Sequence, residues 1–123
     1  MDRVVDRLVK ALGGLDEVSS VILYGSHARG EEKPLSDIDI CVVTKKGVGG
    51  LAKADITSQS SRKVDVTLFW DLPTTIRYSI LKEGEVLLQK DEDFMHAVTV
   101  ETMQEYLDFK HIIDRNVARV FGT

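Results

Sequence analysis

The chain has 123 residues, 43% of them hydrophobic, and a formal net charge of −4. This length predicts a single domain over residues 1–123, and the acidic balance argues against a broad basic surface for duplex nucleic acid. No apolar run approaches the roughly 20 residues that a membrane-spanning helix needs, and the N-terminus is typical of an amphipathic helix rather than a cleavable signal. One cysteine, Cys41, excludes an intrachain disulfide and is compatible with the reducing cytoplasm.

The first third of the chain predicts a helix followed by two strands. Asp2 can cap the helix, and Gly13 ends it. Its apolar stripe consists of Val4, Val5, Leu8, Val9 and Leu12. Strands are predicted at 19–25 and 37–44, with a short helix at 26–29 and a polar loop between them.

In the remainder of the chain, the pattern predicts a short helix at 51–58, a third strand at 63–70 and another helix at 71–82. An edge strand is predicted at 85–89, and a long terminal helix from Asp91 or Asp93 onward. Pro73 is expected in the first turn of the second of these helices, and Gly84 near its end. Apolar residues of the terminal helix cover more circumference than one core-facing stripe needs. The helix therefore either wraps the domain or, as we favour, offers a surface to another protein.

The most informative pattern is Gly25-Ser26, followed after ten residues by Asp37-Ile38-Asp39. Side chains alternate faces along a strand, so Asp37 and Asp39 point the same way. Two carboxylates on one face repel each other unless a cation neutralises them, and Mg²⁺ is commonly held by carboxylates together with substrate phosphates. The pattern indicates nucleotide chemistry. The alternative is that Asp37 only caps the preceding turn.

A third carboxylate, Asp65, lies in the alternating segment 63–69. If this strand pairs beside the strand at 37–44, Asp65 joins Asp37 and Asp39, and three carboxylates suit two divalent ions about 3.5–4 Å apart. Asp65 is also a candidate base for the incoming hydroxyl. The pattern leaves the register between the strands open, and an exposed polar face remains the alternative for Asp65.

The strand-to-helix turn at Gly25-Ser26 presents unpaired backbone N–H groups to an anion. Glycine lets the backbone approach a triphosphate closely, and the hydroxyl of Ser26 is positioned to donate to a phosphate oxygen. Arg29, one turn later, either contacts a phosphate or carboxylate or is a solvated helix-end residue. Cys41 shares the face of Asp39, where a small buried thiol is expected.

The segments Leu23-Tyr-Gly-Ser-His-Ala-Arg-Gly30, Ser36-Asp-Ile-Asp-Ile40 and Val64-Asp-Val66 together resemble the minimal nucleotidyltransferase group of the polymerase-beta-like superfamily. The resemblance covers nearly the whole chain. It implies an α/β (α+β) fold, in which a small mixed sheet is flanked by helices and followed by a long terminal helix. It also implies ATP as substrate and a two-ion Mg²⁺ site. The residues carried over are Asp37, Asp39 and Asp65 as catalytic metal ligands, and Gly25, Ser26 and Arg29 at the nucleotide.

Stand-alone members of this group pair with a separate helical protein of the HEPN family in toxin–antitoxin modules. The resemblance implies that this chain is a cytoplasmic antitoxin that transfers AMP to a tyrosine of its RNase partner, within a homo- or hetero-oligomer and without direct contact to nucleic acid or membrane. Two alternatives remain: an antitoxin that neutralises its partner by docking alone, and a nucleotidyltransferase for a small molecule.

Overall fold

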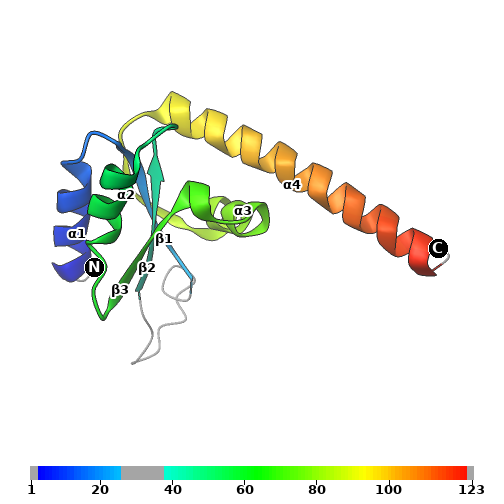
Figure 1. Cartoon of the computed structure of the whole chain (residues 1–123), viewed down its shortest axis with the longest axis horizontal. Coiled ribbons are helices and arrows are strands. Elements are labelled where there is room, and N and C mark those ends of the chain that lie inside the picture. The colour runs from blue at the N-terminus through cyan, green and yellow to red at the C-terminus, as the bar shows by residue number, and fades with distance from the viewer. Residues whose placement is uncertain (1–2, 26–37, 122–123) are drawn as a thin grey trace.

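The computed structural model describes residues 3–25 and 38–121, which form four helices, a 3-10 turn and four strands (Figure 1). In chain order the elements are α1 (Arg3–Gly13), β1 (Val18–Tyr24), β2 (Ile38–Thr44), α2 (Gly50–Thr57), β3 (Val64–Leu68), the 3-10 turn η1 (Phe69–Asp71), α3 (Thr74–Glu83), β4 (Glu85–Gln89) and α4 (Glu92–Phe121). The short helix predicted at 26–29 lies outside the described residues. Within the described part of the chain, no helix combines the length and apolar character that crossing a membrane requires.

The four strands form one mixed sheet in the order β3-β2-β1-β4. β1 runs antiparallel to both β2 and β4, whereas β2 and β3 are parallel. Parallel neighbours need a crossover connection, and α2 supplies it. This arrangement confirms the predicted small mixed sheet and places β3 beside β2, as the expected third carboxylate requires.

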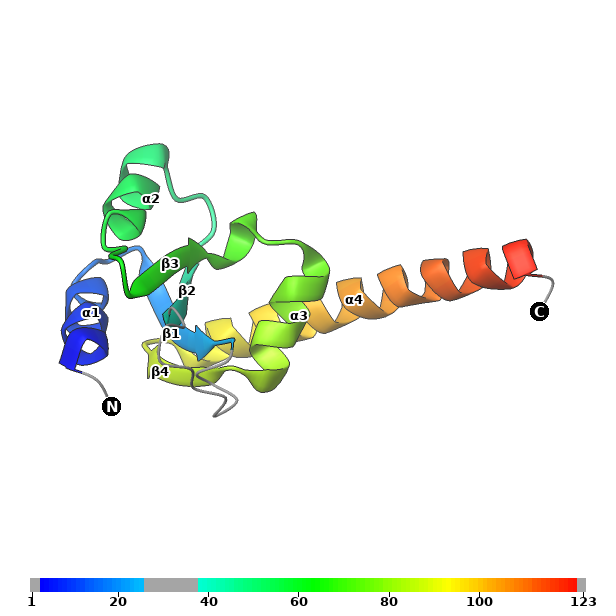
Figure 2. The same ribbon diagram turned by 90° about the horizontal axis from the view of Figure 1, so that it is seen from below.

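Helices cover both faces of the sheet, as the two perpendicular views show (Figures 1 and 2). On one face, α1 and α2 pack on the strand residues that alternate with the carboxylates; this cluster includes Leu12, Ile38, Ile40, Ile56, Val64 and Val66. On the other face, α3 and the first turns of α4 bury a second cluster, which includes Ile22, Cys41, Val43, Phe69, Ile80, Met95 and Val98. The carboxylates lie on this second face, because side chains alternate along β2 and β3.

The ends of three elements differ from the sequence prediction or sharpen it. β3 ends at Leu68 rather than residue 70, because the chain turns into η1, where Trp70 donates its indole N–H to the carbonyl of Thr44 at 2.8 Å. Pro73 lies at the N-cap of α3, one residue before its first turn. For α4, Asp91 is the capping residue: its carboxylate accepts the backbone N–H of Phe94 at 3.0 Å.

The apolar stripe of α1 is narrower than predicted. Val5, Leu8 and Leu12 are buried, but Val4 is 40% exposed. Val9 is partly buried and packs against the same cluster, so Val4 is the one residue of the predicted stripe that faces solvent.

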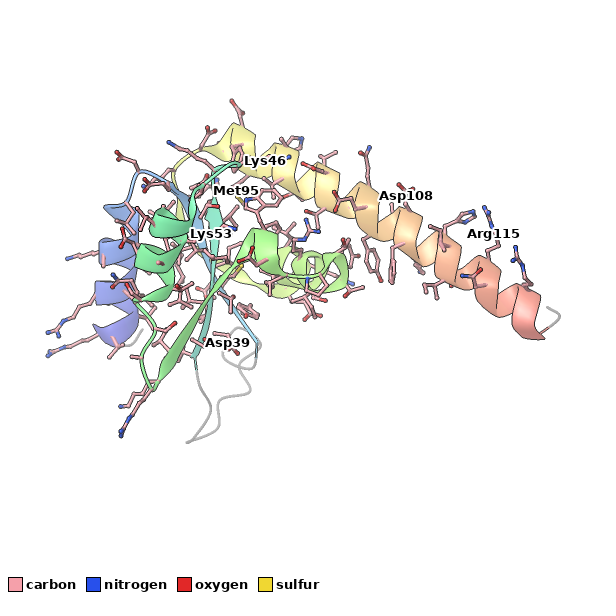
Figure 3. The ribbon with its side chains drawn as sticks, in the orientation of Figure 1. Asp39, Lys46, Lys53, Met95, Asp108 and Arg115 are labelled. Atoms are coloured by element: carbon pink, nitrogen blue, oxygen red, sulfur yellow. The ribbon has the colours of Figure 1, made fainter. Side chains whose placement is uncertain are left out.

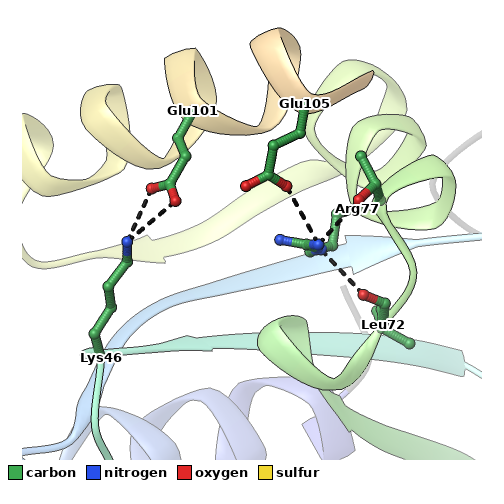
Figure 4. Close-up of polar contacts among 6 residues, drawn as sticks. Lys46, Leu72, Arg77, Glu101 and Glu105 are labelled. Carbon is green, nitrogen blue, oxygen red and sulfur yellow. Dashed lines mark hydrogen bonds and ion pairs between the residues drawn. The ribbon is translucent and has the colours of Figure 1, made fainter. Parts of the chain in front are cut away.

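Helix α4 is tied to the domain along its first half. The ring of Tyr106 stacks on that of Tyr78 in α3, with centroids 3.8 Å apart and planes 4° from parallel. Figure 4 shows two ion pairs that accompany the stack, Lys46 with Glu101 at 2.9 Å and Arg77 with Glu105 at 3.4 Å. Arg77 also donates to the carbonyl of Leu72 at 3.0 Å.

Beyond Tyr106 the helix projects away from the sheet and from α3 (Figure 1). Every side chain from 107 to 116, the segment that we term the α4 overhang, is exposed. Its large apolar side chains are Leu107, Phe109, Ile112 and Ile113. Phe109 and Ile113 continue, at helical spacing, the stripe of Met95, Val98 and Thr102 that is buried nearer the sheet. The apolar face of α4 therefore extends past the domain that covers it. The sequence indicated an excess around the circumference of the helix, whereas the structure shows it along the length, and the surface for another protein stays a prediction.

Candidate active site

Two of the predicted carboxylates lie side by side on neighbouring strands. Asp39 of β2 and Asp65 of β3 are direct partners in the parallel register, so their α-carbons are separated by one strand spacing of about 4.8 Å. Asp39 is half-buried and Asp65 is exposed. Both are at the edge of the sheet where β2 and β3 begin and β1 ends, and Figure 3 shows Asp39 at this end of the molecule. The register that the sequence left open thus brings these two side chains together.

Gly25 joins this pair from the end of β1. Its φ is +80°, a conformation that side chains with a β-carbon rarely adopt. A β-carbon built on it would lie 2.6 Å from Oδ2 of Asp39, so the missing side chain is what lets the turn reach the carboxylate. The turn of the Gly-Ser motif and the second aspartate of the Asp-x-Asp motif are therefore in contact. The other predicted site residues, Asp37, Ser26 and Arg29, lie outside the described residues.

Two hydroxyl groups that sequence reasoning did not select lie beside the carboxylates. Tyr24 ends β1 as the direct partner of Asp39, and its hydroxyl is 3.1 Å from that of Thr67 on β3. Thr67 in turn donates to the carbonyl of Ile40 at 3.4 Å. Burial raises the pKa of Tyr24; the hydrogen bond to Thr67 opposes this rise, and the negative charges of Asp39 and Asp65 add to it. The tyrosine therefore remains a neutral phenol near neutral pH.

The remaining residues on this face have structural roles. Cys41 is fully buried in the second cluster, and burial raises the pKa of its thiol to about 12, so it is protonated and confirmed as core. Phe69 is fully buried and Trp70 packs against the same cluster, as expected for residues at a strand end. Lys63, one residue before β3, is exposed.

The residues present fit a divalent cation. Adjacent carboxylates supply the hard oxygen ligands that Mg²⁺ binds, and their mutual repulsion favours a cation between them. In the described ranges, no three His, Cys, Asp or Glu side chains converge. A cavity of about 580 Å³ lies on the same sheet face but beside β4 and the start of α4. Its lining includes Ile22, His96 and the carboxylates of Glu92 and Asp93, but neither Asp39 nor Asp65. A phosphate-bound cation requires negative charge rather than cavity size, which favours Asp39 and Asp65 over this cavity as the candidate site.

Comparison with known proteins shows relatives in sequence and in fold. A family model described as polymerase beta, nucleotidyltransferase matches residues 6–93. MJ1547 of Methanocaldococcus jannaschii, provisionally named a protein adenylyltransferase, is 36% identical over 73 residues, which cover 59% of this chain and 57% of that relative.

Two solved structures share the fold over nearly the whole chain. A chain of a toxin–antitoxin complex with AMP-PNP superposes with a TM-score of 0.73 at 18% identity, covering 96% of each chain. A chain of the complex between tri-AMPylated Shewanella oneidensis HEPN toxin and MNT antitoxin gives a TM-score of 0.66 at 17% identity, covering 95% of this chain and 92% of that chain.

The family model spans all four strands of the sheet, and with them Gly25, Asp39 and Asp65. The chain belongs to the polymerase beta nucleotidyltransferase family.

Proposed function

We propose that this chain is a Mg²⁺-dependent protein adenylyltransferase that transfers AMP from ATP to a hydroxyl of a partner protein. The observation that carries the proposal is the arrangement of three residues: Asp39 and Asp65 are partners in the strand register, and Gly25 packs on the carboxylate of Asp39. Family membership supports nucleotidyl transfer, and the provisional name of the archaeal relative supports a protein acceptor.

Asp39 and Asp65, with Asp37 from the same motif, would hold the ions. Bound Mg²⁺ supplies charge neutralisation at the triphosphate and polarises its phosphoryl oxygens. Backbone N–H groups at Gly25 and Ser26 bind the triphosphate, with Arg29 as a further phosphate contact. Together these groups orient the α-phosphate toward the face on which the carboxylates lie.

The exposed carboxylate of Asp65 is the candidate general base. It accepts the proton of the acceptor hydroxyl while that oxygen forms a bond to the α-phosphorus. The bond between the α-phosphorus and the bridging oxygen breaks, and pyrophosphate leaves. Asp65 suits this role better than Asp39, because Asp39 is half-buried against Gly25 whereas Asp65 is open to an incoming side chain.

We propose that the acceptor is a tyrosine of a HEPN-family toxin and that the chain is its cytoplasmic antitoxin. Two observations support this partner: the structures that share the fold come from toxin–antitoxin complexes, and the α4 overhang presents an apolar surface that the domain leaves uncovered. The overhang also favours a second candidate function, an antitoxin that neutralises its partner by docking alone.

Transfer of label from ATP carrying ³²P at the α-phosphate tests the proposal. The purified chain is incubated with Mg-ATP and a catalytically competent HEPN partner, and Asp39→Asn and Asp65→Asn are compared with Asp16→Asn, an exposed aspartate in the turn after α1. Label on the partner should fall by about 100-fold or more in the two site variants, since a metal ion supplies several kcal/mol of charge stabilisation. It should be unchanged in Asp16→Asn.

The same variants separate catalysis from docking. If Asp39→Asn still binds the toxin but no longer relieves its growth arrest, neutralisation requires the transfer. If Asp39→Asn neutralises the toxin as well as the wild type does, docking alone suffices and the enzymatic proposal is wrong.

A further inference from the structure

We infer that Tyr24 and Thr67 are positioning residues for the metal-binding carboxylates, acting through a hydroxyl pair that crosses the sheet beneath them. The inference rests on the proposed function, because it assigns a role at the same site. Neither hydroxyl is expected to touch the nucleotide or the acceptor. Each acts through Asp39 or Asp65.

The pair connects strands that are not neighbours. Tyr24 is on β1 and Thr67 is on β3, with β2 between them. Two strand spacings amount to about 10 Å, a gap that a tyrosine bridges only by laying its ring across the middle strand. Its direct partner on that strand is Asp39. The ring therefore lies over β2 between the carboxylate of Asp39 and the buried thiol of Cys41, whose partner is Thr67.

The geometry allows either hydroxyl to donate between Tyr24 and Thr67, and one assignment satisfies both hydrogen bonds of Thr67. Thr67 donates to the carbonyl of Ile40 at 3.4 Å, which leaves its oxygen free to accept from the phenol of Tyr24 at 3.1 Å. The resulting chain runs from β1 to β3 and back to the backbone of β2. It fixes the Tyr24 ring and the χ1 angle of Thr67, and Thr67 is two residues from Asp65 on the same face.

Both carboxylates have this pair as a neighbour. Gly25 directly follows Tyr24 and packs on Oδ2 of Asp39. A hydrogen bond that fixes the end of β1 therefore also fixes the contact between Gly25 and Asp39. The ring closes the inner side of the site, because Tyr24 packs against the second apolar cluster. Asp39 is thereby kept facing outward, where a cation is accessible. Ligating side chains commonly depend on such supporting groups, and loss of one lowers metal affinity or activity by about 10–100-fold.

A purely structural role would predict a different outcome. β1 is already held to β2 along its length by the backbone ladder from Val18 to Tyr24. Removing one hydroxyl from the end of that ladder leaves the register in place. The expected effect is therefore on the metal site rather than on the fold.

The test measures Mn²⁺ affinity by electron paramagnetic resonance in the presence of AMP-PNP, which reports the site without any transfer. Tyr24→Phe and Thr67→Val should each weaken Mn²⁺ binding by about 10-fold. The double variant should be no weaker than either single variant, since both break the same bond. Thr67→Ser, which keeps the hydroxyl, should bind within about twofold of the wild type, and kcat for AMP transfer should follow the same order with little change in KM for ATP.

Matched controls are available on α3 and α4. Tyr78→Phe removes the hydroxyl of a ring that stacks on Tyr106, away from the site. Thr99→Val removes a half-buried hydroxyl that donates to the carbonyl of Met95 in its own helix. Neither should change Mn²⁺ affinity. If Tyr24→Phe has wild-type Mn²⁺ affinity, or if the losses of affinity of the two single variants multiply in the double variant, the inference is wrong but the proposed function stands. A wild-type chain that binds no Mn²⁺ with AMP-PNP would overturn the proposed function, and the inference with it.

Discussion

Replacement of Gly25 by alanine should damage the site more than the fold. The added β-carbon has two consequences. An L-residue with a side chain pays about 1–2 kcal/mol for a left-handed backbone conformation, and φ at this position is +80°. For a domain of this size, that loss corresponds to a fall in Tm of about 3–8 °C.

The second consequence is steric. The β-carbon would lie 2.6 Å from Oδ2 of Asp39, and ordinary contact begins at 3.4 Å, so the turn and the carboxylate must separate by 0.8 Å. Functional groups need to be held to about 0.5 Å, and a displacement near 1 Å can cost about 100-fold in rate. We therefore expect Gly25→Ala to lose AMP transfer about 100-fold while remaining folded at room temperature.

Gly47→Ala is the matched control for this experiment. Gly47 has the same φ of +80°, but a β-carbon there has no heavy atom within 4 Å. Its loss of Tm should be no greater than that of Gly25→Ala, whereas its transfer rate and Mn²⁺ affinity should equal those of the wild type. Thermal denaturation and the α-phosphate label assay measure the two quantities separately. Equal activity of the two alanine variants would refute the reasoning, because it would show that contact with Asp39 has no bearing on the reaction.

Three other expectations concern the rest of the molecule. Asp91→Ala should lower the free energy of unfolding by about 1 kcal/mol in urea titrations, since it removes the cap of α4, whereas Asp93→Ala, whose side chain is not the cap, should cost less. Ile113→Asp on the α4 overhang should abolish co-purification of the HEPN partner with an unchanged Tm, because the side chain is 44% exposed in the free chain; retained binding would exclude this surface. Cys41 should react with an aromatic disulfide reagent at pH 8 only as fast as the chain opens, and rapid labelling of the native protein would contradict its burial and its pKa of about 12.

Much of the fold could be predicted from local patterns. The helical stripe of α1, the alternation in β2 and β3, and the stop at Gly84 are properties of short segments, and the structure confirms each element. Boundaries that depend on tertiary contacts were less predictable. β3 ends at Leu68, because the indole of Trp70 bonds across to Thr44, a contact 26 residues away that no local pattern encodes.

In the candidate site too, features that depend on local pattern were predictable and features that depend on tertiary contacts were not. The phase of Asp39 and of Asp65, each within its own strand, follows from alternation and was predictable. Their pairing depends on the parallel register through α2, and only the structure supplies it. The hydroxyl pair of Tyr24 and Thr67 could not be predicted, because each residue has an ordinary strand pattern and they meet only when β1 and β3 flank β2. The roles of Asp37, Ser26 and Arg29 stay predictions.

The crossover through α2 has a consequence for how the protein acquires its activity. Closing the loop between two parallel strands costs conformational entropy before the strands can pair. Such contacts therefore form late in folding. Asp39 and Asp65 are therefore apart in any state in which β3 has not docked, and no partially folded chain should bind the metal–nucleotide complex well. Binding then stabilises only the native state, so ligand at 100 times its Kd should raise the free energy of unfolding by about 2.7 kcal/mol. In a cell, the supply of nucleotide would thus affect the survival of this chain against proteases as well as its turnover.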